Sequence, residues 1–234
     1  MTRGRVSMDV TRHDSVESIS LNQKNKMFEP KNIIDISLPL NEQTIVYPGN
    51  PFFSMEKIQS PGGSQLAKIS FGTHFGTHVD APAHVFASGK NVDELSLDNF
   101  IGPCRVLDAS ECAEVVSKNF LEKFNIRGGE RILLKTKNSE RGYEEFCKDY
   151  VYLAGDAAQY LADKNVKLVG IDYLSVKQKG SPDNTPHTAL LKKNISILEG
   201  INLNKVEQEE YFLIAAPLAL IGADGSPARA LLLK

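Results

Sequence analysis

Three of the five histidines in this 234-residue chain lie within eleven residues, with an aspartate among them. The stretch begins at His74, continues through His78 and Asp80, and ends at His84. Neutral imidazole nitrogens and carboxylate oxygens are common protein ligands of zinc, manganese and iron. A chain that gathers these groups so closely has to fold around them. The stretch therefore predicts a divalent-metal site, and a structural or surface histidine cluster is the alternative.

The residues inside this stretch favour a bent loop over a helix. His74 and His78 have the four-residue spacing of a helical pair, but the intervening Gly and Thr are poor helix formers and Pro82 follows closely. In an extended segment, residues two apart point to the same side, so His78 and Asp80 would share one side. Pro82 then stiffens the exit and holds His84 towards the same cavity.

The spacing also bears on two other metal motifs. No glutamate follows His74, so the H-E-x-x-H motif of zinc proteases is absent. His78, Asp80 and the distant His187 match the two-histidine, one-carboxylate triad of iron oxygenases. That class usually needs a cation after the last histidine, and the ten residues after His187 supply two lysines and no arginine. An oxygenase would also leave two motif histidines without a role, so it is the weaker alternative.

Charge and hydropathy exclude two classes of partner. The chain carries 27 Lys and Arg against 29 Asp and Glu, a formal net charge of −2, so it lacks the basic excess that nucleic-acid binding needs. No run approaches the roughly 20 apolar residues of a membrane-spanning helix. We therefore expect a small-molecule partner, with no nucleic acid and no membrane.

The cysteines and the N-terminal segment bear on location. Cys104, Cys112 and Cys147 are odd in number and form no C-x-x-C pair, which indicates reduced, buried thiols rather than disulfides. Residues 1–30 lack the apolar stretch of a secretory signal and are predicted to be a mobile tail. A cytoplasmic protein is expected, with one folded domain over residues 31–234.

The apolar pattern predicts a single compact α/β domain. Strands outnumber helices, and the two kinds of element alternate along the chain. Strands are expected over 32–37, 65–71, 105–108, 131–136, 167–173, 210–215 and 229–233, helices from Ser117 and over 156–165, and turns at 47–51 and 224–227.

The histidine stretch resembles the signature of the cyclase-like metal-dependent hydrolases, a family that includes bacterial kynurenine formamidases and isatin hydrolases. The signature is H-x-G-T-H-x-D-x-P-x-H, and residues 74–84 match every fixed position. Segments 35–40, 47–49, 170–175 and 217–229 also resemble parts of the family's chain. The resemblance implies an α/β fold of the swivelling β/β/α type, with a mixed sheet and a small barrel-like core. It also implies a homodimer or homotetramer.

The resemblance further assigns the metal ligands. His74, His78 and Asp80 would hold one divalent ion. His187 and Glu199, twelve residues apart, would be further ligands, with one or two ions bound. Zn²⁺ is the expected ion and Mn²⁺ is the alternative.

Such an ion implies hydrolysis by metal-bound hydroxide. A divalent metal lowers the pKa of its water from about 15.7 to roughly 7, and it polarises a carbonyl group. An amide nitrogen must then be protonated before it can leave, and the ordinary pKa of histidine suits that step. His84, at the far end of the signature, is the predicted proton shuttle.

Five further residues are predicted to contact the substrate. Tyr47, Phe71 and Phe75 are candidate aromatic walls for a flat molecule, with aromatic core packing as the alternative. Asp172 and Ser175 could orient a carbonyl or an amine, or could simply end a strand and begin a turn.

These expectations together predict an arylformamidase-like, metal-dependent hydrolase of C–N bonds in small carbonyl compounds. The expected substrate is an aryl formamide, such as N-formylkynurenine of tryptophan catabolism, or a cyclic amide. Two alternatives stay open. One is a cyclase or dehydratase of a small polyketide-like substrate, and the other is a metal-holding binding module without turnover.

Overall fold

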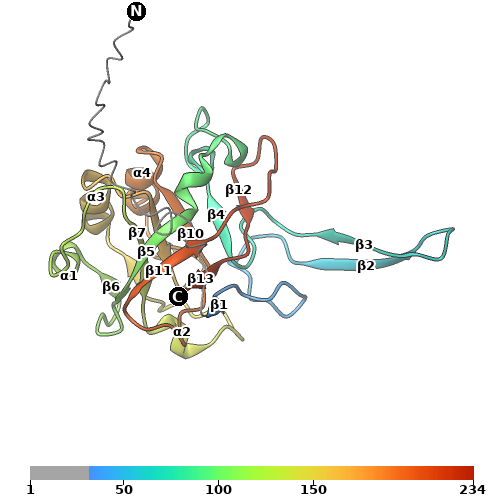
Figure 1. The fold of residues 1–234 in the computed structure, drawn as a ribbon, viewed down its shortest axis with the longest axis horizontal. Helices are drawn as coiled ribbons and strands as arrows, with labels where there is room; N and C mark the ends of the chain where they lie inside the picture. Colours follow the sequence, from blue (N-terminus) through green and yellow to red (C-terminus); the bar gives the residue numbers. More distant parts are fainter. Residues whose placement is uncertain (1–31) are drawn as a thin grey trace, which may run out of the picture. The chain divides into compact units, whose positions relative to one another are not determined.

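The computed structural model describes residues 32–234 (Figure 1). Nine of its strands build one mixed sheet, and the others form two separate pairs. The predicted tail at residues 1–30 lies outside the described residues. The sheet curls into a half-barrel, so the predicted α/β class with a mixed, barrel-like sheet is confirmed. Across the sheet, the strands are β1 (Ile33–Asp35), β13 (Leu231–Leu233), β11 (Glu210–Ile214), β5 (Ile101–Asp108), β7 (Arg131–Lys135), β9 (Leu168–Ile171), β10 (Ser196–Glu199), β4 (His78–Asp80) and β12 (Gly225–Pro227).

The middle of the sheet is parallel and its flanks are antiparallel. β5, β7, β9 and β10 run parallel to one another, while β11 and β4 pair antiparallel on either side of them. β7 and β9 are nearly continuous apolar runs, as expected for strands covered on both faces. Helices α3 (Gly155–Asp163) and α4 (Thr185–Leu191) lie in the connections from β7 to β9 and from β9 to β10, and they share one core cluster with the sheet.

Helix α3 forms where the sequence predicted it, over 156–165. Its buried residues recur at helical spacing and form one apolar face; they are Ala157, Ala158, Leu161 and Ala162. The helix ends before Asn165, whose φ of +54° is a left-handed conformation that asparagine tolerates better than most residues.

The helix predicted from Ser117 is much shorter than expected. The Ser117 hydroxyl does accept a hydrogen bond from the Phe120 amide, 3.2 Å away, as a helix cap should. The helix is nevertheless a single turn, α1 (Lys118–Leu121). Another single turn is α2 (Asn138–Arg141), and the short strands β6 (Val115–Val116) and β8 (Tyr152–Leu153) pair with each other in parallel.

Most predicted strands are present, but besides β12 three elements in the segments next to the histidine residues were not predicted as helix or strand. These are α4, β10 and the hairpin strand β2 (Ser54–Gln59). Pro186 and the turn-forming residues before it concealed α4, because proline suits the first helical turn but also signals a loop. The extended segment predicted for His78 and Asp80 is confirmed as β4, and Pro82–His84 follows as a 3₁₀ turn.

The turn predicted at 224–227 is wrong. Gly225–Pro227 forms β12, which pairs antiparallel with β4 along its whole length. Its turn-like composition misleads because β12 lies at the edge of the sheet, where a proline costs no ladder hydrogen bond. The correction matters because it places Asp224 beside the histidine stretch. The turn predicted at 47–51 is confirmed, since the Asn50 amide donates to the Tyr47 carbonyl at 2.9 Å.

Strand β2 and strand β3 (Gln65–Ser70) form a separate hairpin that extends away from the large sheet (Figure 1). Every residue of both strands is exposed. The chain leaves β3 and enters the histidine stretch only four residues later, so the hairpin is directly joined to the candidate site.

The three cysteines are unpaired. Cys104 is buried, as predicted, whereas Cys112 and Cys147 are only half-buried. Between residues 32 and 234, no helix is both long and apolar enough to cross a membrane. The cytoplasmic location stays a prediction.

Candidate metal centre

Strands β4 and β10 and helix α4 bring four buried polar residues together. Alternation along β4 sends His78 and Asp80 to one face, while Val79 packs into the core on the other. Glu199, the last residue of β10, pairs with His78 across the ladder. Helix α4 packs against β10 and carries His187.

The side chains of these four residues meet at short distances. His78 Nε2 lies 3.3 Å from Glu199 Oε2 and 3.5 Å from Asp80 Oδ1. His187 Nε2 lies 3.5 Å from Glu199 Oε1 and 3.6 Å from Asp80 Oδ2. Each imidazole thus faces both carboxylates, and all four residues are buried.

Three side-chain atoms of this cluster make no hydrogen bond within residues 32–234, so they remain available as ligands for a metal. Among the described residues, His78 Nε2, Asp80 Oδ2 and His187 Nδ1 are buried without a hydrogen-bond partner, which is rare in native proteins. His78 Nδ1 contacts the Gly76 carbonyl at 2.9 Å, which makes Nδ1 the protonated nitrogen and leaves the lone pair on Nε2. The chemistry of these residues therefore fits a divalent ion.

His74 lies between two carboxylates in the loop before β4. Its Nδ1 is 2.8 Å from Asp80 Oδ1, and its Nε2 is 2.9 Å from Asp224 Oδ2. Burial lowers the pKa of His74, but the two carboxylates more than offset this and raise it to about 9. For Asp80, burial raises the pKa, but the neighbouring histidines, His74 above all, outweigh burial and hold the pKa of this carboxyl well below its usual range.

A cavity of 300 Å³ opens above the cluster. It is lined by His74, His78, His84, His187 and Glu199 together with Tyr47, Asn50, Val85, Leu174, Ser175, Lys177 and Asn184. The His84 ring is about a third exposed, with its centroid 4.1 Å from that of His74 and 5.5 Å from that of His187. The structure thus brings the six predicted metal and proton-transfer residues together. Five of them line this cavity, as do Tyr47 and Ser175, whereas Asp80 is fully buried against His74 and His78.

Three of the predicted substrate contacts lie elsewhere. Phe75 is 1% exposed and stacks on Phe53 and Phe71, so it packs in the interior instead of lining this cavity. Phe71 lines a different groove. For both residues, the alternative of aromatic packing describes the structure better.

The third of these residues, Asp172, is buried and forms hydrogen bonds within the protein interior. Its carboxylate accepts hydrogen bonds from the amide and hydroxyl groups of both Thr136 and Ser139, at 2.7 to 3.2 Å. Burial raises the pKa of Asp172 to about 6, although these hydrogen bonds act in the opposite direction. Asp172 therefore ties β9 to the loop after β7, and it is absent from the cavity wall.

Asp224 is the residue of this region that the sequence analysis missed. Its Oδ2 lies 2.9 Å from His74 Nε2 and 3.5 Å from His84 Nδ1. The local sequence around it indicates a turn, and nothing there points to residues 150 positions away. The signal that remained was the resemblance of segment 217–229 to the family's chain.

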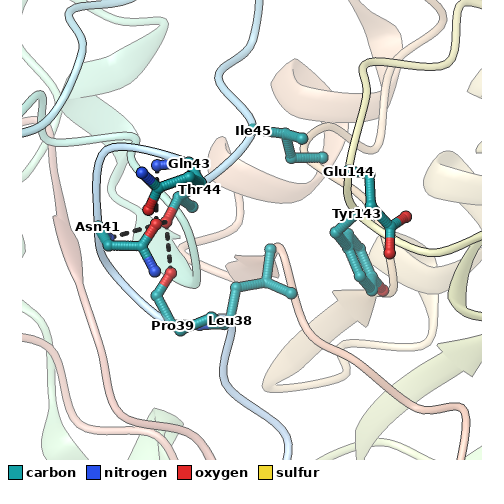
Figure 2. Close-up of a pocket in the computed structure, with 8 residues that line it drawn as sticks. All are labelled: Leu38, Pro39, Asn41, Gln43, Thr44, Ile45, Tyr143 and Glu144. Carbon is teal, nitrogen blue, oxygen red and sulfur yellow. Dashed lines mark hydrogen bonds between the residues drawn. The ribbon is translucent and has the colours of Figure 1, made fainter.

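A second cavity, of 310 Å³, lies between the chain after β1 and the loop after α2 (Figure 2). Its lining is mostly uncharged, with Glu144 as its acidic residue. Two of its polar groups already form hydrogen bonds within the protein. The Tyr143 hydroxyl donates to the Ile201 carbonyl at 2.8 Å, and the backbone amide of Asn41 donates to Thr44 Oγ1 at 2.9 Å. It lacks the histidines and paired carboxylates of the first cavity.

Comparison with known sequences agrees with this geometry. A family model described as "Putative cyclase" matches residues 34–178. The kynurenine formamidase of Bacillus cereus is 39% identical to this chain over 202 residues, covering 85% of this chain and 96% of the relative. That of Bacillus anthracis is 40% identical over the same length, with the same coverage.

Solved structures share the fold. A potential metal-dependent hydrolase with cyclase activity has a TM-score of 0.78 and 33% identity, over 86% of this chain and 97% of that one. Isatin hydrolase A from Ralstonia solanacearum has a TM-score of 0.74 and 26% identity, over 86% of this chain and 91% of that one. The predicted resemblance is confirmed: this chain belongs to the cyclase family, alongside kynurenine formamidases and other metal-dependent hydrolases.

Proposed function

We propose that this protein is a metal-dependent hydrolase of C–N bonds in small carbonyl compounds, and that an aryl formamide such as N-formylkynurenine is its substrate. The similarity of this chain to kynurenine formamidases, which covers 96% of their length, supports this proposal, and so does the fold that it shares with an isatin hydrolase. One observation of the structure carries the proposal. Two buried imidazoles and two buried carboxylates converge beneath a cavity that a more exposed histidine also lines.

Five residues would hold one or two divalent ions, namely His74, His78, Asp80, His187 and Glu199. The candidate ligand atoms of His74, His78 and Asp80 lie within 4.8 Å of one another. A bound divalent ion supplies Lewis acidity for the carbonyl group and lowers the pKa of a water molecule. Imidazole and carboxylate ligands suit Zn²⁺ better than metals that prefer thiolate ligands, such as Cu⁺, and Mn²⁺ is the alternative.

His84 is the residue best placed to move a proton to the substrate. Its Nδ1 faces Asp224, so the opposite nitrogen, Nε2, is left for the cavity. When the carbonyl carbon gains an oxygen and its bond to nitrogen breaks, the departing nitrogen needs a proton. Nε2 of His84 would donate it and recover it from the next water molecule.

The walls of the cavity can orient a flat, polar molecule. Tyr47 and Leu174 offer apolar surface, while Asn50 and Ser175 offer hydrogen-bonding groups. The ring of Tyr47 packs edge-on against Phe146, with centroids 5.5 Å apart, so its position is supported from behind.

The experiment that tests the function is metal removal and restoration. The purified protein is treated with a chelator, reloaded with Zn²⁺ or Mn²⁺, and assayed on formamides, lactams, esters and cyclisable ketides. Metal-dependent release of kynurenine from N-formylkynurenine supports the proposal. Turnover confined to lactams or ketides would contradict the aryl formamide and assign a cyclic amide or a polyketide-like molecule as the substrate. Stoichiometric metal without any turnover would favour a binding module.

We also propose that the chain works as a homodimer or homotetramer held together by the β2–β3 hairpin. A lone two-stranded hairpin is marginally stable in water, and this one has large apolar side chains on both faces. Met55 lies opposite Ile69 on one face and Ile58 opposite Leu66 on the other, each 41–55% exposed.

A second copy of the chain is the partner that suits this hairpin. A groove of 590 Å³ with apolar residues such as Leu40, Leu218 and Pro227 includes Phe71, which follows β3 at the root of the hairpin. Because each chain carries both a hairpin and a groove beside its root, a two-fold arrangement can supply every hairpin with a groove.

A further inference from the structure

We propose that Asp224 is a positioning residue that uses one carboxylate to orient both His74 and His84. The part of this inference that concerns proton transfer rests on the proposed function. Asp224 is absent from the cavity wall, so it would act on the substrate only through the two histidines.

The contacts of Asp224 are divided between its two oxygens. Oδ2 lies 2.9 Å from His74 Nε2 and 3.5 Å from His84 Nδ1, while Oδ1 accepts a hydrogen bond from the Thr73 hydroxyl at 2.9 Å. The rings of His74 and His84 are neighbours, 4.1 Å between centroids. A single oxygen thus serves two adjacent imidazoles, and the other oxygen sets the plane of the carboxylate.

The backbone holds Asp224 where these contacts need it. Its carbonyl accepts a hydrogen bond from the Ala81 amide at 3.0 Å, and the next residue, Gly225, pairs with Asp80. A Cβ atom on Gly225 would lie 2.7 Å from His74 Cε1 and 2.8 Å from the Val79 carbonyl oxygen. Glycine is therefore required at 225 for the His74 ring to lie against β12, with Asp224 at the end of that strand.

The chemical consequence follows from the nature of a carboxylate, which only accepts hydrogen bonds when ionised. Asp224 places a proton on His74 Nε2 and on His84 Nδ1. His74 then presents Nδ1 towards Asp80 and the metal-binding residues, and His84 presents Nε2 to the cavity. Metal-binding histidines commonly donate their other nitrogen to a carboxylate in this way, which fixes both tautomer and ring orientation.

An amide at position 224 would lose this control while changing the volume little. The side chain of an Asp224→Asn variant keeps one oxygen for the two rings but loses the negative charge, and its amino group cannot accept the hydrogen bond that the Thr73 hydroxyl gives to Oδ1. The matched control is Asp93→Asn. Asp93 accepts a hydrogen bond from the Gly222 amide at 3.0 Å, so it contacts the same segment of chain without touching either histidine.

Three measurements test the proposal. In zinc-free protein, ¹⁵N NMR of the imidazole rings reports the tautomer of His84 and the protonation state of His74. A competition titration gives the zinc affinity, and steady-state kinetics at saturating zinc give kcat and KM. For Asp224→Asn we expect the His84 signal to lose its Nδ1–H pattern, zinc affinity to fall about 10- to 100-fold, and kcat to fall by a similar factor with KM nearly unchanged.

The controls decide whether the effect belongs to the carboxylate. Asp93→Asn should match the wild type in all three measurements, and Asp224→Glu should recover part of the loss because it keeps an ionised acceptor. Thr73→Val, which leaves the carboxylate in place but removes its Oδ1 partner, should show a smaller effect in the same direction and serves if Asp224→Asn does not fold. Wild-type tautomers and wild-type zinc affinity in the Asp224 and Thr73 variants would overturn the proposal. If the wild type hydrolyses no substrate, the proposed function fails, whereas the NMR and zinc measurements still decide the role of Asp224.

Discussion

Asp80 and Glu199 are two buried carboxylates that share the same pair of histidine neighbours. Two like charges in a buried site repel each other, and burial disfavours both ionised forms. The protein offsets this with imidazoles: His187 and His78 hold the pKa of Glu199 below its usual value, although burial and Asp80 act in the opposite direction. A divalent cation would relieve the same repulsion, so the residues favour metal loading at neutral pH.

The metal-free protein should lose stability as the pH rises. The folded state raises the pKa of His74 from 6.5 to about 9, so it holds this proton more tightly than the unfolded chain does. The stabilisation is complete below pH 6.5 and is lost as the pH rises through 9. Urea unfolding in excess chelator should show a loss on the order of 2–3 kcal/mol across this window. His74→Gln should flatten the slope, and an unchanged slope in that variant would assign the effect to another group.

His84 and His78 should separate turnover from metal binding. His84→Ala should retain the metal and lose about 10²- to 10⁴-fold in kcat, because it removes only the proton donor. His78→Ala should lose both metal and activity, since it removes a ligand buried within the cluster. Elemental analysis paired with kinetics checks this. A metal-free His84→Ala protein would instead make His84 a ligand.

At the scale of elements, the site depends on a close approach between β10 and the loop before β4. Gly200, directly after Glu199, has φ of +67°, and a Cβ atom there would lie 2.2 Å from the Gly76 carbonyl oxygen. Hydrogen bonds secure the approach, since the Thr77 hydroxyl donates to the Gly200 carbonyl at 2.5 Å and accepts from the Leu38 amide at 2.8 Å. Backbone packing of this kind sets the separation between Glu199 and His78.

Gly200→Ala should therefore cost more than an alanine in the same conformation elsewhere. Gly180 provides the control, because its φ is +77° but its Cβ would meet nothing within 4 Å. Gly180→Ala should cost about 1–2 kcal/mol from the left-handed conformation alone. Gly200→Ala should cost a further 1–3 kcal/mol, on the order expected of overpacking, and should weaken zinc binding. Equal unfolding free energies for the two variants would show that the clash is absorbed without moving β10.

In the molecule as a whole, the described residues bury most large apolar side chains in the domain but leave those of the β2–β3 hairpin exposed. Two large core clusters fill the two faces of the nine-stranded sheet, whereas the hairpin exposes apolar side chains on both of its faces. Surface of this kind is typical of a protein that associates with a partner. The proposed homodimer or homotetramer follows from that imbalance.

Ile58→Glu should dissociate the assembly, because it places a charge in the middle of the proposed interface. Light scattering after size exclusion should show the wild type as a dimer or tetramer and the variant as a smaller species. Leu97→Glu is the matched control, since Leu97 is also a large exposed apolar residue but lies outside the hairpin and its groove. A monomeric wild type, or dissociation by the control alone, would contradict the role of the hairpin.

The family and the inner part of the candidate site were predictable from the amino-acid sequence. Residues within eleven positions of one another cannot separate far, and a glycine- and proline-containing stretch admits few conformations, so His74, His78, Asp80 and His84 could be grouped before any fold was known. The central strands were also predictable, because apolar runs buried on both faces have a distinctive composition.

The surroundings of that stretch depend on long-range packing and could not be predicted from local sequence. Strand pairing turned a turn-like segment into β12 and brought Asp224 to residues 150 positions away, which no local preference encodes. The packing of neighbouring loops directed Asp172 to Thr136 and Ser139, and the aromatic stack drew Phe75 into the interior. Whether a polar or aromatic side chain lines a cavity depends on what other elements place over it, and that information is spread over the whole chain.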